Sequence, residues 1–202
     1  MEYTNILLES FRVSDNSLYG TIPIGISRLP LKMFVIARNL FSGTIPEDFL
    51  LIEGLEDAQL DYNLLTGVIP DKYDDIQSLS EFWLSRNFLS GTIPEWIGLA
   101  SGLKILYLQY NAFTGTLPEN WNLDNVERSK CNALFLFIWQ KLILEIFSLV
   151  QVQANQLSGT IPSGLFALPQ LQELQLRNNK FSGPIQLPKV LTKTAIKICK
   201  ID

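Results

Sequence analysis

Histidine is absent from the 202-residue sequence, and cysteine occurs only twice. Without histidine the chain has no Ser-His-Asp or Cys-His catalytic arrangement, no His-ligated zinc or haem site, and no histidine pH switch. The two cysteines, Cys131 and Cys199, are too few for a disulfide framework or a four-thiolate metal site. Their spacing does not show whether they pair, and two free thiols are the simpler interpretation.

Charged residues are also scarce, at 18% of the chain, where an average soluble protein has about 25%. Sixteen basic and twenty acidic residues give a net charge of -4, so no basic footprint indicates binding to nucleic acid or to an anionic membrane. Apolar residues make up 47%, which is too many for a disordered chain. We therefore expect one domain of ordinary size or one short array of repeats.

No segment of the sequence predicts a secretory signal or a membrane span. Residues 1–5 lack the basic start and the long apolar core of a signal peptide. The apolar run at 134–150 contains Lys141 and Glu145, and it is shorter than the roughly 20 apolar residues that a spanning helix needs. We interpret this run as buried or damaged structure.

A repeated motif dominates the rest of the chain. The string Asn-x-x-x-Gly-x-Ile-Pro, once with leucine for isoleucine and once with a displaced proline, begins at Asn16, Asn39, Asn63, Asn87, Asn111, Asn155 and Asn179. Apolar residues stand eight, five and three positions before each asparagine, as Leu79, Phe82 and Leu84 do before Asn87. This is the L-x-x-L-x-L-x-x-N pattern of leucine-rich repeats.

Each part of the repeat has a physical role. The apolar-x-apolar pair has the period of a strand, and stacked copies of such a short strand predict a parallel sheet. A buried asparagine without partners is costly, so one at the same place in every turn predicts a hydrogen-bonded ladder. The glycine permits a backbone conformation that side chains disfavour, and the proline ends the pairing because it has no N–H.

The interval between Asn111 and Asn155 is 44 residues, about twice the others, and contains a degenerate repeat at about 119–147. Asn132 keeps the repeat asparagine, but Leu136 and Trp139 replace the glycine and the proline. The strand before Asn132 falls on the poorly apolar sequence VERSK. We therefore expect this region to depart from the regular coil.

The segments SGTIPEDF, TGVIPDKY, SGTIPEWIG, TGTLPENW and SGTIPSGLFALPQLQELQLRNN closely resemble the 24-residue plant-type leucine-rich repeat. This class builds the ectodomains of plant receptor-like kinases and receptor-like proteins, and the polygalacturonase-inhibiting proteins. The resemblance implies an α/β fold, a curved right-handed solenoid or horseshoe. It also implies a parallel sheet on the concave face, short helical turns on the convex face and an extra short strand around each Gly-x-Ile-Pro. We expect about eight repeats in residues 1–187 and a non-repeat tail in 188–202.

Function in this family is recognition, so the resemblance implies a peptide or protein ligand, with a co-receptor as a further candidate partner, at the extracellular side of the plasma membrane. Signal peptide, cysteine caps, membrane span, kinase motifs and Asn-x-Ser/Thr sequons are missing from the sequence. These departures predict a fragment or truncated form of a receptor ectodomain in signalling or defence. The alternative is a soluble inhibitor or scaffold of the polygalacturonase-inhibitor type.

Catalysis is disfavoured by the sequence. Carboxylate pairs such as Asp57 and Asp61, or Asp74 and Asp75, invite comparison with a glycosidase acid and base. Chance pairs are expected among twenty acidic residues, and an open sheet offers no closed pocket. We expect no enzyme activity, no catalytic residues, no cofactor and no metal.

The candidate binding residues lie four, two and one positions before the asparagines, where side chains face outward from the concave sheet, and Asp57 lies beside them. Exposed tryptophan, tyrosine and arginine are enriched at binding hot spots, and they cluster in the three turns that end at Asn63, Asn87 and Asn111. Cross-strand packing that stiffens the sheet is the alternative interpretation. The predicted ligand-binding residues are Asp57, Asp61, Tyr62, Trp83, Arg86, Tyr107, Gln109 and Tyr110.

Overall fold

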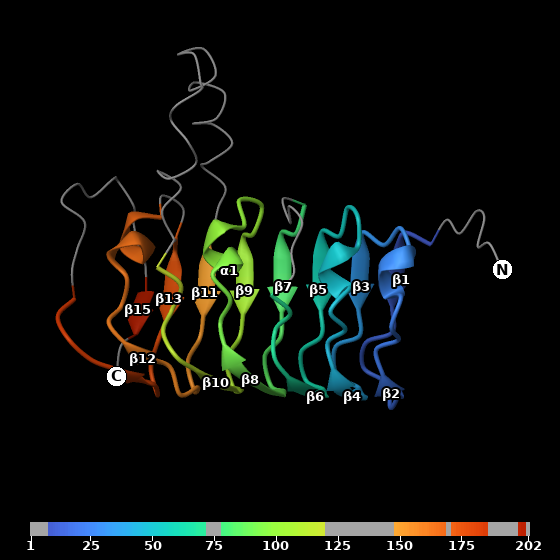
Figure 1. The fold of residues 1–202 in the computed structure, drawn as a ribbon, viewed down its shortest axis with the longest axis horizontal. Coiled ribbons are helices and arrows are strands. Elements are labelled where there is room, and N and C mark those ends of the chain that lie inside the picture. The colour runs from blue at the N-terminus through green and yellow to red at the C-terminus, as the bar shows by residue number, and fades with distance from the viewer. Residues whose placement is uncertain (1–7, 72–77, 120–147, 169–170, 186–197, 201–202) are drawn as a thin grey trace, which may run out of the picture.

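The computed structural model describes residues 8–71, 78–119, 148–168, 171–185 and 198–200. Each repeat forms one coil of the chain, and the coils stack side by side along the long axis of the molecule (Figure 1). The apolar residues of the repeat point into the stack, so neighbouring coils bury surface that no single coil could bury alone. The predicted parallel-strand solenoid is confirmed.

One short strand from each described coil enters an eight-stranded parallel sheet, the concave sheet. Its strands in spatial order are β1 (Ser10–Arg12), β3 (Met33–Val35), β5 (Asp57–Gln59), β7 (Glu81–Trp83), β9 (Ile105–Tyr107), β11 (Leu149–Gln151), β13 (Glu173–Gln175) and β15 (Ile198–Lys200). The central residue of a strand points into the core, as Phe82 and Leu106 do with no exposed surface. Its two neighbours therefore face the concave side.

Further short strands follow the asparagines, as the resemblance implied. They are β2 (Tyr19–Thr21), β4 (Leu40–Thr44), β6 (Leu64–Gly67), β8 (Phe88–Thr92) and β10 (Ala112–Thr114) in one sheet, and β12 (Ser158–Gly159) and β14 (Lys180–Phe181) in another. Short helical turns follow four of the Ile-Pro pairs: η1 (Ile26–Arg28), η2 (Phe49–Leu51), α1 (Trp96–Leu99) and η6 (Ser163–Ala167).

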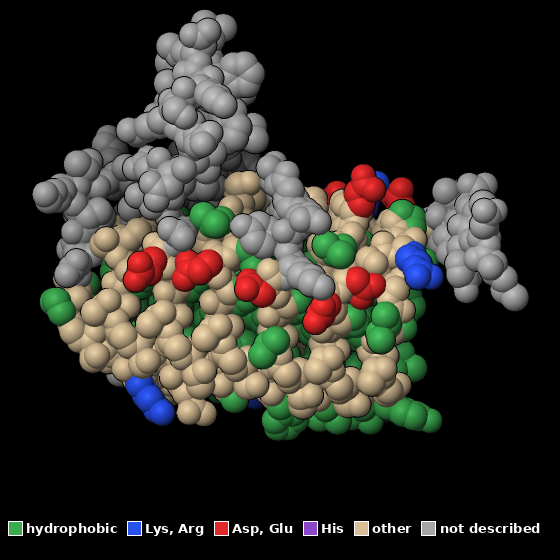
Figure 2. All heavy atoms as spheres, viewed as in Figure 1, with side chains coloured by type: hydrophobic (Ala, Val, Ile, Leu, Met, Phe, Trp, Pro, Cys, Tyr) green, Lys and Arg blue, Asp and Glu red, His purple; other side chains and the backbone are tan. Residues whose placement is uncertain are grey.

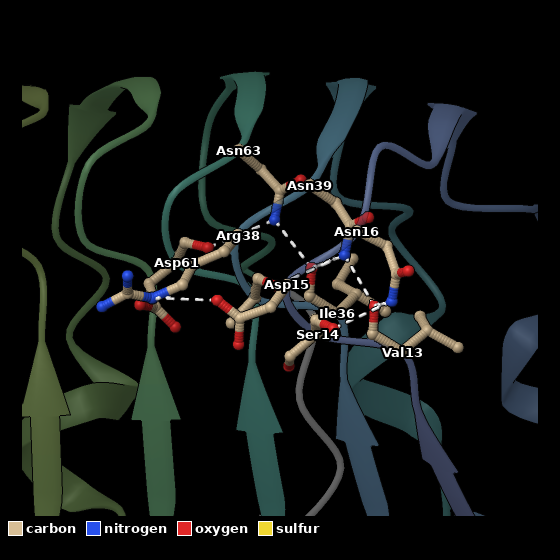
Figure 3. A network of polar contacts seen from close by, with 10 residues as sticks. Val13, Ser14, Asp15, Asn16, Ile36, Arg38, Asn39, Asp61 and Asn63 are labelled. Atoms are coloured by element: carbon tan, nitrogen blue, oxygen red, sulfur yellow. Dashed lines mark hydrogen bonds and ion pairs between the residues drawn. The ribbon is translucent and has the colours of Figure 1, made fainter.

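The asparagines form the predicted ladder between coils. The Asn63 side-chain amide donates to the carbonyl of Ile36 in the preceding coil at 3.1 Å (Figure 3) and also to the carbonyl of Leu60 in its own coil at 3.1 Å. Its carbonyl oxygen accepts the N–H of Phe41 at 3.0 Å. Equivalent bonds to the neighbouring coil are made by Asn39, Asn87, Asn111, Asn155 and Asn179.

The ladder and the sheet both run directly from β9 to β11. Leu149 pairs with Ile105, and Asn155 donates to the carbonyl of Leu108. β9 and β11 are therefore direct neighbours in the concave sheet. The degenerate repeat predicted at 119–147 falls, apart from its first residue, outside the described residues.

The C-terminal tail, which departs from the repeat sequence, contributes a strand to the concave sheet. Residues Ile198–Lys200 form β15 and pair in parallel with β13. The outer edge of β13 presents backbone N–H and C=O groups, and any extended segment can pair with them whatever its side chains.

Acidic side chains form a row across the face of the molecule that Figure 2 shows. Exposed carboxylates also follow several prolines of the repeat. Their residues are Glu47, Asp71, Glu95 and Glu119.

Among the residues that the structure describes, no helix has both the length and the apolar character needed to cross a bilayer.

Candidate functional site

Backbone pairing extends the concave face beyond the strands themselves. After β5, the N–H of Leu60 donates to the carbonyl of Trp83 at 2.8 Å, and the N–H of Tyr62 donates to that of Ser85 at 2.9 Å. Because the alternation of a strand continues through this stretch, residues six, four and two positions before each asparagine share the concave side.

Two aromatic side chains lie next to each other at the centre of this face. Trp83 on β7 pairs in register with Tyr107 on β9, and their ring centroids are 4.9 Å apart in an edge-to-face arrangement. This confirms the separation of one strand spacing that the repeat register predicts. Both side chains are partly buried. Burial, followed by the nearby carboxylates of Glu173, Glu81 and Asp61, raises the pKa of the Tyr107 hydroxyl.

Alternating arginines and tyrosines form a second row, in the residues just before the asparagines. The Arg86 guanidinium lies 5.0 Å from the ring centroid of Tyr62 and 4.2 Å from that of Tyr110, so it contacts both predicted aromatic faces. Arg38 extends the row at 4.7 Å from Tyr62 and forms an ion pair with Asp15 at 3.7 Å (Figure 3). Sequence reasoning placed Arg38 in this column but did not select it.

This second row has an unusual backbone. The residue before each asparagine has a positive φ, which is 52° at Tyr62, 53° at Arg86 and 59° at Tyr110. Non-glycine residues adopt this left-handed conformation uncommonly. The turn therefore fixes the direction in which these side chains leave the chain, and 40% of Tyr62 and 41% of Tyr110 stay exposed.

The two predicted aspartates face the concave side but are nearly buried there. Only 9% of Asp57 and 6% of Asp61 is exposed. Gln59, between them on the same face, donates to Asp57 at 3.1 Å. One oxygen of each carboxylate, Oδ1, is buried without a hydrogen-bond partner. Both residues therefore lie at the concave side with little of their surface exposed.

Burial shifts the titration of three carboxyl groups at this place. It raises the pKa of Asp61 from its ordinary value of 3.8 to about 6. A backbone hydrogen bond and the charge of Arg38 lower this pKa, and the charge of Asp15 raises it. Burial also raises the pKa of Asp57, although Gln59 and Arg12 act in the opposite direction. The pKa of Glu81 is raised by burial and then by Asp57, while Trp83 lowers it.

These shifts predict a pH dependence of stability. A raised pKa in the folded state means that the contribution of Asp61 is fully present below about pH 3.8 and is lost as the pH rises through about 6. We therefore expect the unfolding free energy of the wild type, relative to Asp61→Asn, to fall between about pH 4 and 7. Urea unfolding across this range measures it, with the exposed Glu53→Gln as control. If the unfolding free energy of Asp61→Asn changes with pH as steeply as that of the wild type, the raised pKa of Asp61 is contradicted.

Gln109, the last predicted residue, lies two positions before Asn111 and is partly buried, with its Oε1 unpartnered. We call Tyr62, Trp83, Arg86, Tyr107, Gln109 and Tyr110 the concave platform. It offers apolar rings, amide and guanidinium donors and carbonyl acceptors on an open, rigid sheet. Among the described residues, no three histidine, cysteine, aspartate or glutamate side chains are grouped to hold a metal ion.

Residues 78–99 and 102–123 match the Leucine Rich Repeat family. The chain is 32% identical over 203 residues to Receptor-like protein 54 of Arabidopsis thaliana, and the match covers 99% of this chain and 19% of that protein. The chain thus spans about a fifth of this curated relative.

Solved plant receptor structures resemble the fold. The plant peptide hormone receptor RGFR1 in complex with RGF2 is 29% identical, with a TM-score of 0.72, over 87% of this chain and 25% of that one. The Arabidopsis receptor kinase HAESA in complex with the peptide hormone IDA and the co-receptor SERK1 is 28% identical, with a TM-score of 0.71, over 91% of this chain and 27% of that one.

Proposed function

Because the chain is a leucine-rich-repeat solenoid that resembles plant receptor ectodomains, we propose that its concave platform recognises an extended peptide or a protein edge. We infer that it does so as part of a receptor-like protein at the extracellular side of the plasma membrane. RGFR1 and HAESA were each solved with a peptide bound, RGF2 and IDA respectively, which supports this class of ligand.

The observation that carries the proposal is the contact between Trp83 and Tyr107 on neighbouring strands, 4.9 Å apart, beside the Arg86 row. Aromatic and arginine side chains dominate binding energy when a partner desolvates them. An open sheet cannot enclose a small molecule, but it can contact an extended segment along several coils.

A displayed library tests this proposal without a known ligand. Random peptides of about 12 residues are selected for binding to the full chain. The affinities of the enriched peptides for the wild type and for its variants are then compared. We expect Trp83→Ala to weaken binding by about 2 kcal/mol, or roughly 30-fold, because a hot-spot side chain is removed. Circular dichroism confirms that the variant keeps the fold.

Tyr19→Ala is the matched control, because Tyr19 is a large exposed aromatic residue on β2, outside the concave sheet. It should leave the affinity unchanged. Two outcomes would contradict the proposal: enriched peptides bind Trp83→Ala as tightly as the wild type, or both substitutions change the affinity equally. The aromatic residues of the platform would then serve only to pack neighbouring strands together.

A further inference from the structure

We propose that the carboxylates of Asp57, Asp61 and Glu81 form the subsite for one basic side chain, lysine or arginine, of the bound segment. This inference rests on the proposed function and specifies the chemistry of its ligand. The three residues are called the acidic subsite below.

The acidic subsite lies on two adjacent strands. Asp57 on β5 is directly opposite Glu81 on β7 in the parallel register. Asp61 follows Asp57 by four residues on the same face, and Gln59 stands between them. Neighbouring strands are about 4.8 Å apart, so one ammonium or guanidinium group can approach carboxylates from both strands.

The carboxylates lack the partners that such burial requires. Asp57 and Asp61 are each more than nine-tenths buried, and each has an oxygen without any hydrogen bond. A buried carboxylate is costly unless a cation or donor satisfies it. A cationic side chain would supply both the charge and the donors that are missing, and Glu81, which is less buried, leaves the subsite open to it.

Arg12 and Arg38 lower the pKa of Asp57 and Asp61 respectively, but their direct contacts are with other groups. Arg12 donates to the sulfur of Met33 at 2.6 Å, and Arg38 contacts Asp15 and the ring of Tyr62. In the part of the chain that the structure describes, the ion pairs found do not include any member of the acidic subsite. Burial is the main cause that raises the pKa of all three carboxyls, which agrees with charged groups that lack sufficient compensation here.

The surroundings also favour a cation on an extended segment. Trp83 lies across from Gln59 in the register, so an aromatic ring borders the subsite, and aromatic faces attract cations. Along the row that contains Asp61, Gln109 and the 95% buried Gln153 each carry an Oε1 without a partner. These acceptors continue across the coils and can receive N–H groups from the same segment.

The test uses N-acetyl-L-arginine amide and its neutral counterpart N-acetyl-L-citrulline amide as probes of the full chain. Chemical shifts of the aspartate carboxyl carbons and of the Trp83 indole N–H report binding at about pH 7. We expect saturable binding of the arginine probe and at least about tenfold weaker binding of citrulline, because only the first carries charge. This comparison needs no variant and is unaffected by folding.

Asp61→Asn should weaken the arginine probe about tenfold, whereas Glu53→Gln, which removes an exposed charge elsewhere, should have no effect. Equal binding of the two probes, or an unchanged affinity in Asp61→Asn, overturns the acidic subsite. The acidic subsite is also overturned if the selected peptides depend on Trp83, contain no basic residue and bind Asp61→Asn with unchanged affinity. That result leaves the proposed function standing. Selected peptides that ignore Trp83 overturn the proposed function alone, provided that the arginine probe still binds.

Discussion

Asn87→Ala is expected to lower the free energy of unfolding by about 4 kcal/mol, because it removes several buried hydrogen bonds at once. The Asn87 amide donates to the carbonyls of Leu60 and Leu84 at 3.0 and 3.2 Å, and its oxygen accepts the N–H of Leu65 at 2.9 Å. The side chain is 6% exposed, so water cannot replace these bonds without opening the stack. Urea unfolding followed by circular dichroism measures the loss.

Asn16→Ala is the matched control at the first coil. Asn16 occupies the same place in the repeat, but it is exposed, and its side-chain amide donates to the nearby carbonyls of Val13 and Ser14 rather than to another coil. Its substitution should cost less than about 1 kcal/mol. Equal losses at the two positions would show that the ladder contributes nothing beyond local turn structure.

Gly67→Ala is expected to cost about 3 kcal/mol, for two additive reasons. Gly67 has a φ of +80°, which disfavours any residue with a Cβ. An added Cβ would also lie 2.8 Å from the Cγ2 methyl of Thr44 in the preceding coil, closer than packed carbon atoms approach. The glycine therefore permits both the turn and the close stacking of coils.

Two further variants separate these causes. Gly54 has a φ of +77°, but no atom lies within 4 Å of its added Cβ, so Gly54→Ala should show the backbone cost alone, about 1 kcal/mol. Thr44→Ser removes the opposing methyl and should recover part of the loss in Gly67→Ala. If Gly54→Ala costs as much as Gly67→Ala, coil stacking does not require the glycine.

The repeat period made most of the fold predictable. A fixed spacing between asparagines places equivalent residues on neighbouring strands, and therefore predicted the Asn63 ladder and the contact between Trp83 and Tyr107 before any coordinates. The same register predicted Arg86 between two aromatic rings. These features depend only on which residues occupy the same position in successive repeats, that is, the same column of the stack.

Other features depend on how columns pack together, which spacing does not reveal. Asp57 and Asp61 are nearly buried, although the repeat places them on the face that the spacing predicts to be exposed. The positive φ before each asparagine has no composition signal, because arginine, tyrosine and alanine all occur there. The strand in the tail forms through backbone groups of β13, so its side-chain pattern gave no indication of it.

We propose that the face formed by β5, β7 and β9 binds the ligand. The most direct test of this proposal is amide hydrogen exchange of the full chain with and without a library-selected peptide. We expect protection to increase in residues 57–62, 81–86 and 105–110 and to remain unchanged in the strands β2, β4, β6 and β8. Protection centred on those four strands or on the helical turns, with none on β7, would contradict it.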